Sequence, residues 1–326
     1  MSNDKITSET QNNTGVLADI SQNWLDMIQR HLKETSYIKY RNLLYNHILP
    51  ELGTTYLSGL STLQVEAFVR KKLKEGRKDQ RGGLKEKTVK DIISVLREIC
   101  LYGAACGEES PCRFDQIRMR QEESPVRILN RAEQETLGRF LLRDGSLTKT
   151  GVLLSLYMGL RLGEVCALKK EHILFGEKVV QVRMTMQRIQ TPGSVGDKKT
   201  KVILTTPKSR KSLRDIPIPP ILQKRLTDLG NLPERAYLLT GSEERFIEPR
   251  TLENIFKRYL KECQMEEINY HALRHTFATR CVERGFDVKT LSEILGHASV
   301  NITLNRYVHS SMERKREHMQ KLQETW

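Results

Sequence analysis

The sequence predicts a mainly α-helical protein with a small antiparallel sheet, an α+β fold divided between two domains. The chain has 326 residues, which is enough for two separate hydrophobic cores. Apolar residues recur at helical spacing through most of its length. Runs rich in Val, Ile and Thr first appear at residue 178 and end by residue 219, so the sheet is small and belongs to the second domain.

The charge balance favours a polyanionic partner. Lys and Arg total 54 against 40 Asp and Glu, a formal charge of +14, and nucleic acid is the commonest partner of so basic a chain. Mere solubility is the alternative when charge is considered alone. The six cysteines include no Cys-x-x-Cys pair, so zinc-site spacing is absent, and a chain of this size does not need disulfides.

The N-terminal segment and the most apolar segment give no sign of export or membrane insertion. Residues 1–14 are polar and lack periodicity, which predicts a disordered tail rather than a signal or transit peptide. The most apolar run, residues 151–160, is too short to cross a bilayer. We therefore expect a cytoplasmic protein with no membrane partner.

Residues 15–107 have the pattern of a small domain of four or five helices. The first helix starts near residue 16, and one face of it carries four apolar residues: Ile20, Trp24, Met27 and Ile28. The second helix, 36–49, should stop at Pro50 and Gly53. Its apolar face consists of Tyr37, Tyr40, Leu44 and Ile48.

Two further helices complete this first domain. Ser61 and Gln64 have the spacing of a capping box, in which each side chain bonds the backbone N–H of the other residue. A helix is therefore expected to begin here and to run to residue 75. After a basic, glycine-containing loop, a fourth helix over 86–107 presents apolar residues at helical spacing: Val89, Ile92, Ile93, Leu96 and Ile99.

The segment 108–128 is predicted to be an interdomain linker, because it has two Ser-Pro steps, mixed charge and weak periodicity. The second domain is expected to occupy residues 129–326. It opens with a helix at Asn130, where Glu133 completes another capping box.

The rest of the second domain combines helices with the small sheet. An apolar helix at 148–159 and a short helix near 163–169 precede three segments with strand composition: 178–189, 200–206 and 214–219. Helices return from Pro249 to the end of the chain. The last of them, within 311–326, has a narrow apolar stripe made of Met312, Met319 and Leu322.

Arg161 is the first candidate functional residue. It follows a buried apolar helix, and Glu164 comes three residues later in "GLRLGE". A guanidinium group at the edge of a core needs an anion, because its charge cannot be left unpaired there. The anion is either a ligand or, in the simpler interpretation, Glu164 itself.

Lys208 lies in a tight Pro-Lys-Ser turn between two predicted strands. The tip of a hairpin suits a mobile ammonium group that has to reach a substrate oxygen. Three more basic residues follow it, Arg210, Lys211 and Arg214, so a general phosphate-contacting patch is the alternative.

The segment "HALRH" places His271 and Arg274 on one face of a helix. His271 and His275 also have the i, i+4 spacing of metal ligands. The chain has no HExxH glutamate and no obvious third ligand nearby, so we expect no metal. His275 is interpreted as a buried, hydrogen-bonded structural residue.

Two further candidates come later in the chain. His297 in "LGHAS" directly follows a glycine at a predicted helix end, from which its side chain can project into a cleft. Tyr307 follows in "LNRYVHSS". Alone, a tyrosine is more often a core residue. Together with two arginines, imidazoles and a lysine, it completes a set suited to metal-free phosphoryl transfer, with tyrosine as the nucleophile.

The order of these residues resembles that of the tyrosine recombinase, or phage integrase, family, including the integrases of phages and conjugative transposons. The residues that carry the likeness are Arg161, Lys208, His271, Arg274, His297 and Tyr307, within "GLRLGE", "HALRHTFAT", "LGHAS" and "RY". The likeness extends over residues 16–326.

The resemblance implies a helical, SAM-like core-binding domain and a C-terminal catalytic domain that form a C-shaped clamp around DNA. It implies site-specific recombination through a covalent 3′-phosphotyrosyl intermediate, without metal, cofactor or ATP, for integration or excision of a mobile element. The implied partners are double-stranded recombination sites, a homo-tetramer on synapsed sites, and accessory directionality factors.

The resemblance also implies a role for each site residue. Arg161 and Arg274 bind the scissile phosphate, His297 hydrogen-bonds one of its oxygens, and Glu164 occupies a supporting acidic position.

The remaining implied roles concern the bonds that form and break. Tyr307 attacks the phosphorus, His271 is the general base, and Lys208 is the general acid for the departing 5′ hydroxyl.

Two other functions are weighed against recombination. A type IB topoisomerase uses a similar residue set to relax DNA as a monomer, but the basic tail after Tyr307 favours the recombinase. A DNA-binding regulator with a degenerate site is the non-enzymatic alternative, and the intact residue set argues against it.

Overall fold

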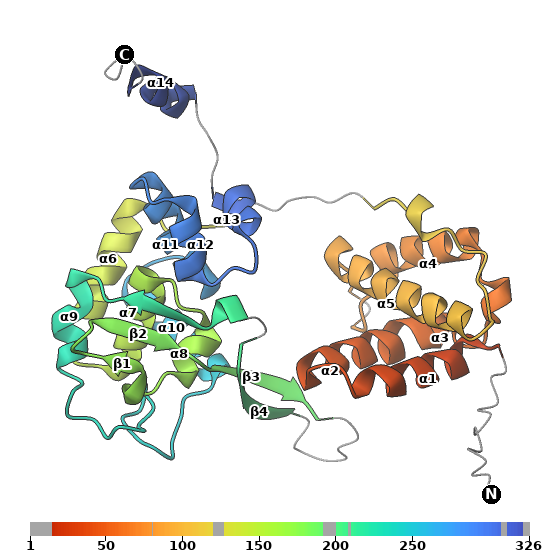
Figure 1. Ribbon diagram of the computed structural model, residues 1–326, viewed down its shortest axis with the longest axis horizontal. Helices are drawn as coiled ribbons and strands as arrows, with labels where there is room; N and C mark the ends of the chain where they lie inside the picture. The colour runs from red at the N-terminus through yellow and green to blue at the C-terminus, as the bar shows by residue number, and fades with distance from the viewer. Residues whose placement is uncertain are drawn as a thin grey trace, which may run out of the picture. The chain divides into compact units, whose positions relative to one another are not determined.

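The computed structural model describes residues 15–79, 81–119, 127–191, 200–207, 210–307 and 312–321. The chain forms two compact units, Met1–Ser124 and Pro125–Trp326 (Figure 1). Each unit has its own hydrophobic core. Among the described helices, none has the length and apolar character that a membrane span requires.

The first unit is helical. Its α-helices are α1 (Leu17–Gln29), α2 (Glu34–Leu43), α3 (Leu49–Leu52), α4 (Thr62–Glu75) and α5 (Glu86–Ala105). Ile20 and Trp24 of α1 are buried as predicted, but Met27 is 44% exposed. The expectation for Met27 is wrong because Leu17 and Trp24 lie near the centre of the buried face, which puts Met27 at its margin.

The second predicted helix runs further than the sequence indicates. A π-helical turn (Leu44–Ile48) connects α2 directly to α3, which ends before Gly53. Pro50 does not stop the helix. The residues on its N-terminal side stay helical through the π-helical turn, and the chain remains helical to Leu52.

The predicted capping box at the start of α4 is confirmed. The Ser61 hydroxyl accepts a hydrogen bond from the Gln64 backbone N–H at 3.3 Å, and the Gln64 side chain accepts from the Ser61 N–H at 2.9 Å. The predicted apolar face of α5 is buried as well.

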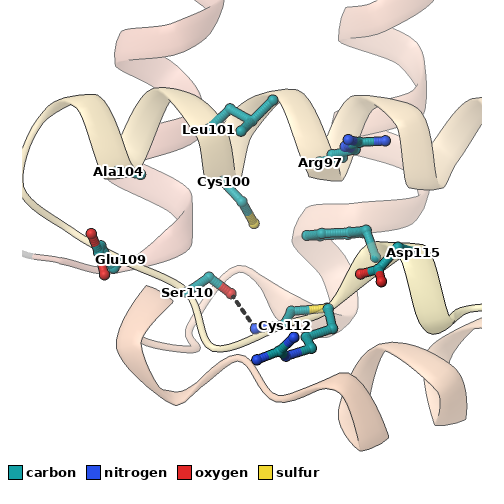
Figure 2. A pocket seen from close by; sticks show the side chains of 10 residues that line it. Arg97, Cys100, Leu101, Ala104, Glu109, Ser110, Cys112 and Asp115 are labelled. Atoms are coloured by element: carbon teal, nitrogen blue, oxygen red, sulfur yellow. Dashed lines mark hydrogen bonds between the residues drawn. The ribbon is translucent and has the colours of Figure 1, made fainter.

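The segment that follows α5 packs against the first unit. Phe114 and Ile117 contact the core of this unit, and the Ser110 hydroxyl donates to the Leu60 carbonyl at 3.1 Å. A hollow of about 340 Å³ lies between α5 and this segment, and its lining includes Cys100 and Cys112 (Figure 2). None of the residues that line it belongs to the predicted catalytic set.

The second unit is built mainly from helices. They are α6 (Arg131–Leu142), α7 (Leu147–Met158), α8 (Leu162–Ala167), α9 (Pro220–Thr227), α10 (Pro249–Glu262), α11 (His271–Glu283), α12 (Val288–Leu295), α13 (Val300–Tyr307) and α14 (Met312–Lys321). α7 contacts α6, α8, α10 and α11, and most of its residues are buried. The second predicted capping box, Asn130 with Glu133, is confirmed at the start of α6.

Within the described residues the strands form two sheets, where the sequence suggests one. β1 (Ile173–Leu174), β2 (Val179–Val182) and β5 (Arg214–Pro217) form an antiparallel sheet in the order β1-β2-β5. β3 (Thr185–Gln190) pairs with β4 (Thr200–Thr205) in a separate antiparallel ladder. The predicted strand 178–189 is broken between β2 and β3, because the chain changes partner there from β5 to β4.

Candidate active site

Arg161 stands at the junction of α7 and α8 in the second unit. α7 ends at Gly159, whose φ of +71° is left-handed, and Arg161 occupies the position directly before α8. A Cβ atom at Gly159 would lie 2.6 Å from a ring carbon of Phe277, so both the backbone angle and the space require glycine. The turn leaves the Arg161 side chain 34% exposed.

Glu164 joins Arg161 to a second arginine. Its carboxylate accepts from the Arg161 side chain at 2.7 Å and from the Arg161 backbone N–H at 2.9 Å. The same carboxylate is paired with the buried guanidinium group of Arg214. Burial raises the pKa of Glu164, but the hydrogen bonds and charge of Arg214 outweigh this effect and bring the pKa to about 2. Glu164 is therefore ionised at neutral pH.

Arg274 is held by main-chain carbonyl groups. The residue is 2% exposed, and its guanidinium group donates to the carbonyl oxygens of Gly159 at 2.7 Å and Leu295 at 2.5 Å. These carbonyls lie at the C-terminal ends of α7 and α12, where the helix dipole is negative. Arg161 likewise donates to the carbonyl of Gly296 at 3.1 Å. The two predicted phosphate-binding arginines therefore meet at two helix ends.

The positive charge of this cluster exceeds the charge that neutralises it. Among the residues that the structure describes, three guanidinium groups (Arg161, Arg214 and Arg274) are near one carboxylate, that of Glu164. Burial, followed by the charge of Arg161, lowers the pKa of Arg274 to about 9, which shows that the two guanidinium groups repel each other. Planar guanidinium groups match the oxygens of a phosphate, so the cluster suits a bound phosphodiester.

One turn of α11 brings two histidines next to Arg274. His271 is exposed and His275 is 4% exposed, and their rings meet edge to face with centroids 4.6 Å apart. Although the surface area of His271 is largely exposed, protein atoms close to its imidazole desolvate it, and this effect, followed by the charge of Arg274, lowers its pKa to about 4. Its imidazole is therefore neutral at physiological pH and can accept a proton.

The phenol of Tyr307 lies against the histidines at the end of α13. The residue is 8% exposed, and its hydroxyl is 2.6 Å from Nδ1 of His275. The ring of His297 is nearly parallel to that of Tyr307, with 6.4 Å between centroids. Burial raises the pKa of Tyr307, while the charges of Arg274 and Arg161, among others, act in the opposite direction. The phenolic oxygen therefore lies within the field of both arginines.

His297 has the placement that the sequence predicts. Gly296 ends α12 with a left-handed φ of +63°, and His297 follows it immediately. Its Nδ1 is 2.8 Å from the hydroxyl of Thr303, which fixes the orientation of the imidazole. Burial, followed by the charge of Arg274, lowers the pKa of His297 to about 3, so this ring is also neutral.

The structure thus brings together all but one of the predicted site residues. Lys208 lies outside the described residues. Within the part of the chain that the structure describes, no group of His, Cys, Asp and Glu side chains has a metal-binding arrangement.

Sequence reasoning missed the roles of two residues. The sequence predicts that Arg214 belongs to the basic patch after Lys208, but in the structure Arg214 is buried against Glu164. The alternating pattern of β5, in which Arg214 and Ile216 are both buried, could have indicated this. His275 is buried and hydrogen-bonded as predicted, but its partner is the hydroxyl of Tyr307. Sequence spacing gives no indication of that contact.

Comparison with known proteins identifies the class. The model of the phage integrase family matches residues 122–314, and that of the N-terminal SAM-like domain of phage integrases matches residues 16–73. The first match covers more than half of the chain, and the chain therefore belongs to the phage integrase family. It is a tyrosine site-specific recombinase, with the mainly helical fold that its sequence predicts.

Individual relatives agree with this assignment. A tyrosine recombinase XerC-like protein of Caldanaerobacter subterraneus subsp. tengcongensis is 27% identical over 315 residues, which cover 90% of this chain and 79% of the relative. Part of the Tn1549 transposon integrase, solved in complex with transposon right end DNA, is 20% identical, with a TM-score of 0.74 over 94% of this chain and 99% of the solved one. A lambda integrase tetramer bound to a Holliday junction is 17% identical, with a TM-score of 0.63 over 91% and 79% of the two chains.

Proposed function

We propose that the protein cleaves and rejoins DNA strands through a 3′-phosphotyrosyl intermediate formed on Tyr307, for the integration or excision of a mobile element. The observation that carries this proposal is the environment of the Tyr307 hydroxyl. This hydroxyl is 2.6 Å from Nδ1 of the neutral imidazole of His275, and the ring of Tyr307 is nearly parallel to that of His297. The charges of Arg161 and Arg274 also act on the phenol. The nearby carboxylate of Glu164 is already occupied by arginines, so it does not repel an incoming phosphate.

The proposed cleavage step is an in-line displacement at phosphorus. The Tyr307 oxygen forms a bond to phosphorus while the bond from phosphorus to the 5′ oxygen breaks. The phenolic proton passes to His271, whose imidazole is neutral, and Lys208 supplies the proton that the departing 5′ oxygen takes up. The new ester retains the energy of the phosphodiester, so rejoining is the reverse reaction and needs no ATP.

The arginines stabilise the transition state of this reaction. Arg161 and Arg274 would bind the nonbridging oxygens, on which extra negative charge develops, and His297 would donate a hydrogen bond to one of them. Glu164 supports the arrangement by holding Arg161 at 2.7 Å. The guanidinium groups are fixed to helix ends before substrate arrives.

The proposed partners are double-stranded DNA sites and further copies of the chain. The similar Tn1549 integrase is solved with transposon DNA and lambda integrase as a tetramer on a Holliday junction, which supports a homo-tetramer on two synapsed sites. We assign residues 15–107 to a core-binding domain and 129–326 to a catalytic domain that together clamp the duplex, and we expect accessory factors to set the direction of recombination.

The test is covalent trapping on a nicked suicide substrate. Tyr307→Phe should retain the DNA affinity of the wild type and form no protein–DNA adduct, because it loses only the phenolic oxygen. Tyr270→Phe is the matched control, since Tyr270 is also buried but its hydroxyl bonds Ser155. An adduct in the Tyr307→Phe variant, or none in the wild type, would contradict the proposal.

A further inference from the structure

The hydrogen bond between His275 and Tyr307 has no role in the reaction as described so far. The His275 Nδ1 atom and the Tyr307 hydroxyl are 2.6 Å apart, both residues are buried, and their ring centroids are 5.6 Å apart. A buried contact of this length is a strong hydrogen bond. Its partner is the oxygen atom that has to attack phosphorus.

The position of His275 in α11 connects this bond to the phosphate-binding residues. His275 directly follows Arg274, and the edge of its ring meets that of His271, one turn earlier. Because Arg274 is fixed to two helix ends, the α11 backbone beside it is fixed as well. The His275 side chain extends from that fixed backbone, so its hydrogen bond with the Tyr307 hydroxyl can hold this hydroxyl at a fixed position relative to Arg274.

The protonation state of His275 suits a neutral hydrogen bond. The charged or titratable groups that act on it are His271 and Arg274 on its own helix and Arg306 on α13. Burial, followed by the charge of these neighbours, lowers its pKa to about 4. The ring is therefore neutral at physiological pH, where Nδ1 can accept from the phenol or donate to it according to the tautomer.

We propose that His275 is a positioning residue for the nucleophile: its Nδ1 atom holds the Tyr307 hydroxyl beside the guanidinium groups of Arg274 and Arg161. This inference rests on the proposed function, in which Tyr307 attacks DNA. The histidine connects the last residue of α13 to the helix that carries the phosphate-binding arginine. Without this bond the hydroxyl loses the hydrogen-bond partner that the structure records for it, and only packing orients the phenol.

The effect of losing this bond should appear in the rate of the chemical step. A displacement of a reacting atom by 1 Å lowers the rate about 100-fold. We expect His275→Leu, which retains most of the side-chain volume without the hydrogen bond, to cleave a suicide substrate about 10- to 100-fold more slowly in a single turnover. Its DNA affinity should be unchanged, because His275 is buried.

The conservative variant is His275→Asn. The end of the asparagine amide occupies nearly the place of Nδ1 and can accept or donate a hydrogen bond, but it does not take up a proton near neutral pH. It should restore most of the cleavage rate, and its pH profile should have the same shape as that of the wild type. A residue that mattered only for packing would give the opposite order, because leucine fills the buried space better than asparagine.

The wild type and Tyr307→Phe are measured first, so that failures can be told apart. If the wild type forms no adduct, the proposed function fails. If it forms one, and His275→Leu cleaves at the wild-type rate, the inference alone is overturned. It is also overturned if His275→Asn is as slow as His275→Leu. Should His275→Leu fail to fold, His275→Ala replaces it in the same comparison with His275→Asn.

Discussion

The guanidinium group of Arg214 meets the carboxylate of Glu164 at two points, with nitrogen–oxygen distances of 3.0 and 2.8 Å, and both side chains are at most 5% exposed. Arg214 also donates to the carbonyl of Ile294 at 2.6 Å. The pair therefore connects β5, α8 and α12. Because Glu164 also binds Arg161, this network sets the position of a predicted phosphate-binding group.

Glu164→Gln should lower the free energy of unfolding by about 3–5 kcal/mol, because it leaves the buried charge of Arg214 without its counter-ion. Urea unfolding measures the change. Glu253→Gln is the control, since Glu253 pairs with the exposed Arg250 at 3.3 Å, and surface pairs contribute at most about 1 kcal/mol. Equal effects of the two substitutions would show that the buried network does not stabilise the fold.

The contribution of Glu164 to stability should depend on pH. Its pKa is about 2 in the folded protein, below the ordinary value of 4.5. A group whose folded pKa is depressed stabilises fully above its unfolded pKa and loses that contribution as pH falls toward the folded value. The difference in unfolding free energy between wild type and Glu164→Gln should therefore be constant above about pH 5.5 and narrow steadily toward pH 3. A difference that widens on acidification would reverse the assigned sign.

Gly159→Ala should impair both stability and cleavage. The left-handed backbone costs a residue with a Cβ about 1–2 kcal/mol, and the new atom would press on the ring of Phe277. The displaced Gly159 carbonyl would also release Arg274. Gly145→Ala is the matched control, because a Cβ there has open space and its backbone angle is not left-handed. Unfolding and single-turnover cleavage of both variants test this, and a stable, active Gly159→Ala protein would argue against the role of this turn.

Lys208→Ala should lose cleavage on ordinary DNA and recover it when the leaving 5′ oxygen is replaced by sulfur. Sulfur departs without protonation, so the general acid is no longer needed. Comparing single-turnover rates on the two substrates measures the recovery. Arg161→Ala is the control, and it should be impaired on both substrates, because the proposed role of Arg161 is to bind the phosphate. Equal impairment of Lys208→Ala on both substrates would restrict Lys208 to DNA positioning.

Deletion of residues 311–326 should weaken cooperative assembly and leave binding to a single half-site intact. On α14, Met312 is 62% and Met319 is 65% exposed, and so short a helix needs a surface to dock on. We expect that surface to be a neighbouring protomer. Gel-shift titration on half-sites and full sites measures the effect. Unchanged cooperativity and recombination in the truncated protein would count against docking in trans.

Local chemistry made helix ends in both units predictable. The capping boxes at Ser61 and Asn130 marked helix starts because the partner groups lie three residues apart in the sequence. Gly296, directly before His297, marked a helix end because glycine readily adopts the left-handed backbone that ends many helices. The site residues were predicted from their order, since few reactions use arginines, histidines and a tyrosine without paired carboxylates.

Features that depend on long-range contacts were not predictable. The division of the strands into two sheets depends on which segment each strand meets, as when β2 pairs with β5. Arg214 and Glu164 are 50 residues apart, and His275 and Tyr307 are 32 apart. The sequence indicates that such side chains need partners, but the tertiary fold determines which partners they find.

Main-chain carbonyl groups should hold Arg274 in place whether or not the site contains a ligand. Carbonyl dipoles at helix ends should stay in place when an anion enters. Within the described residues no ion pair of Arg274 has to break first, so little reorganisation should accompany binding. The same arrangement leaves Arg161 and Arg274 repelling each other while the site is empty. In the proposed function a DNA phosphate would offset this repulsion, so DNA should stabilise the folded protein as a ligand as well as react with it.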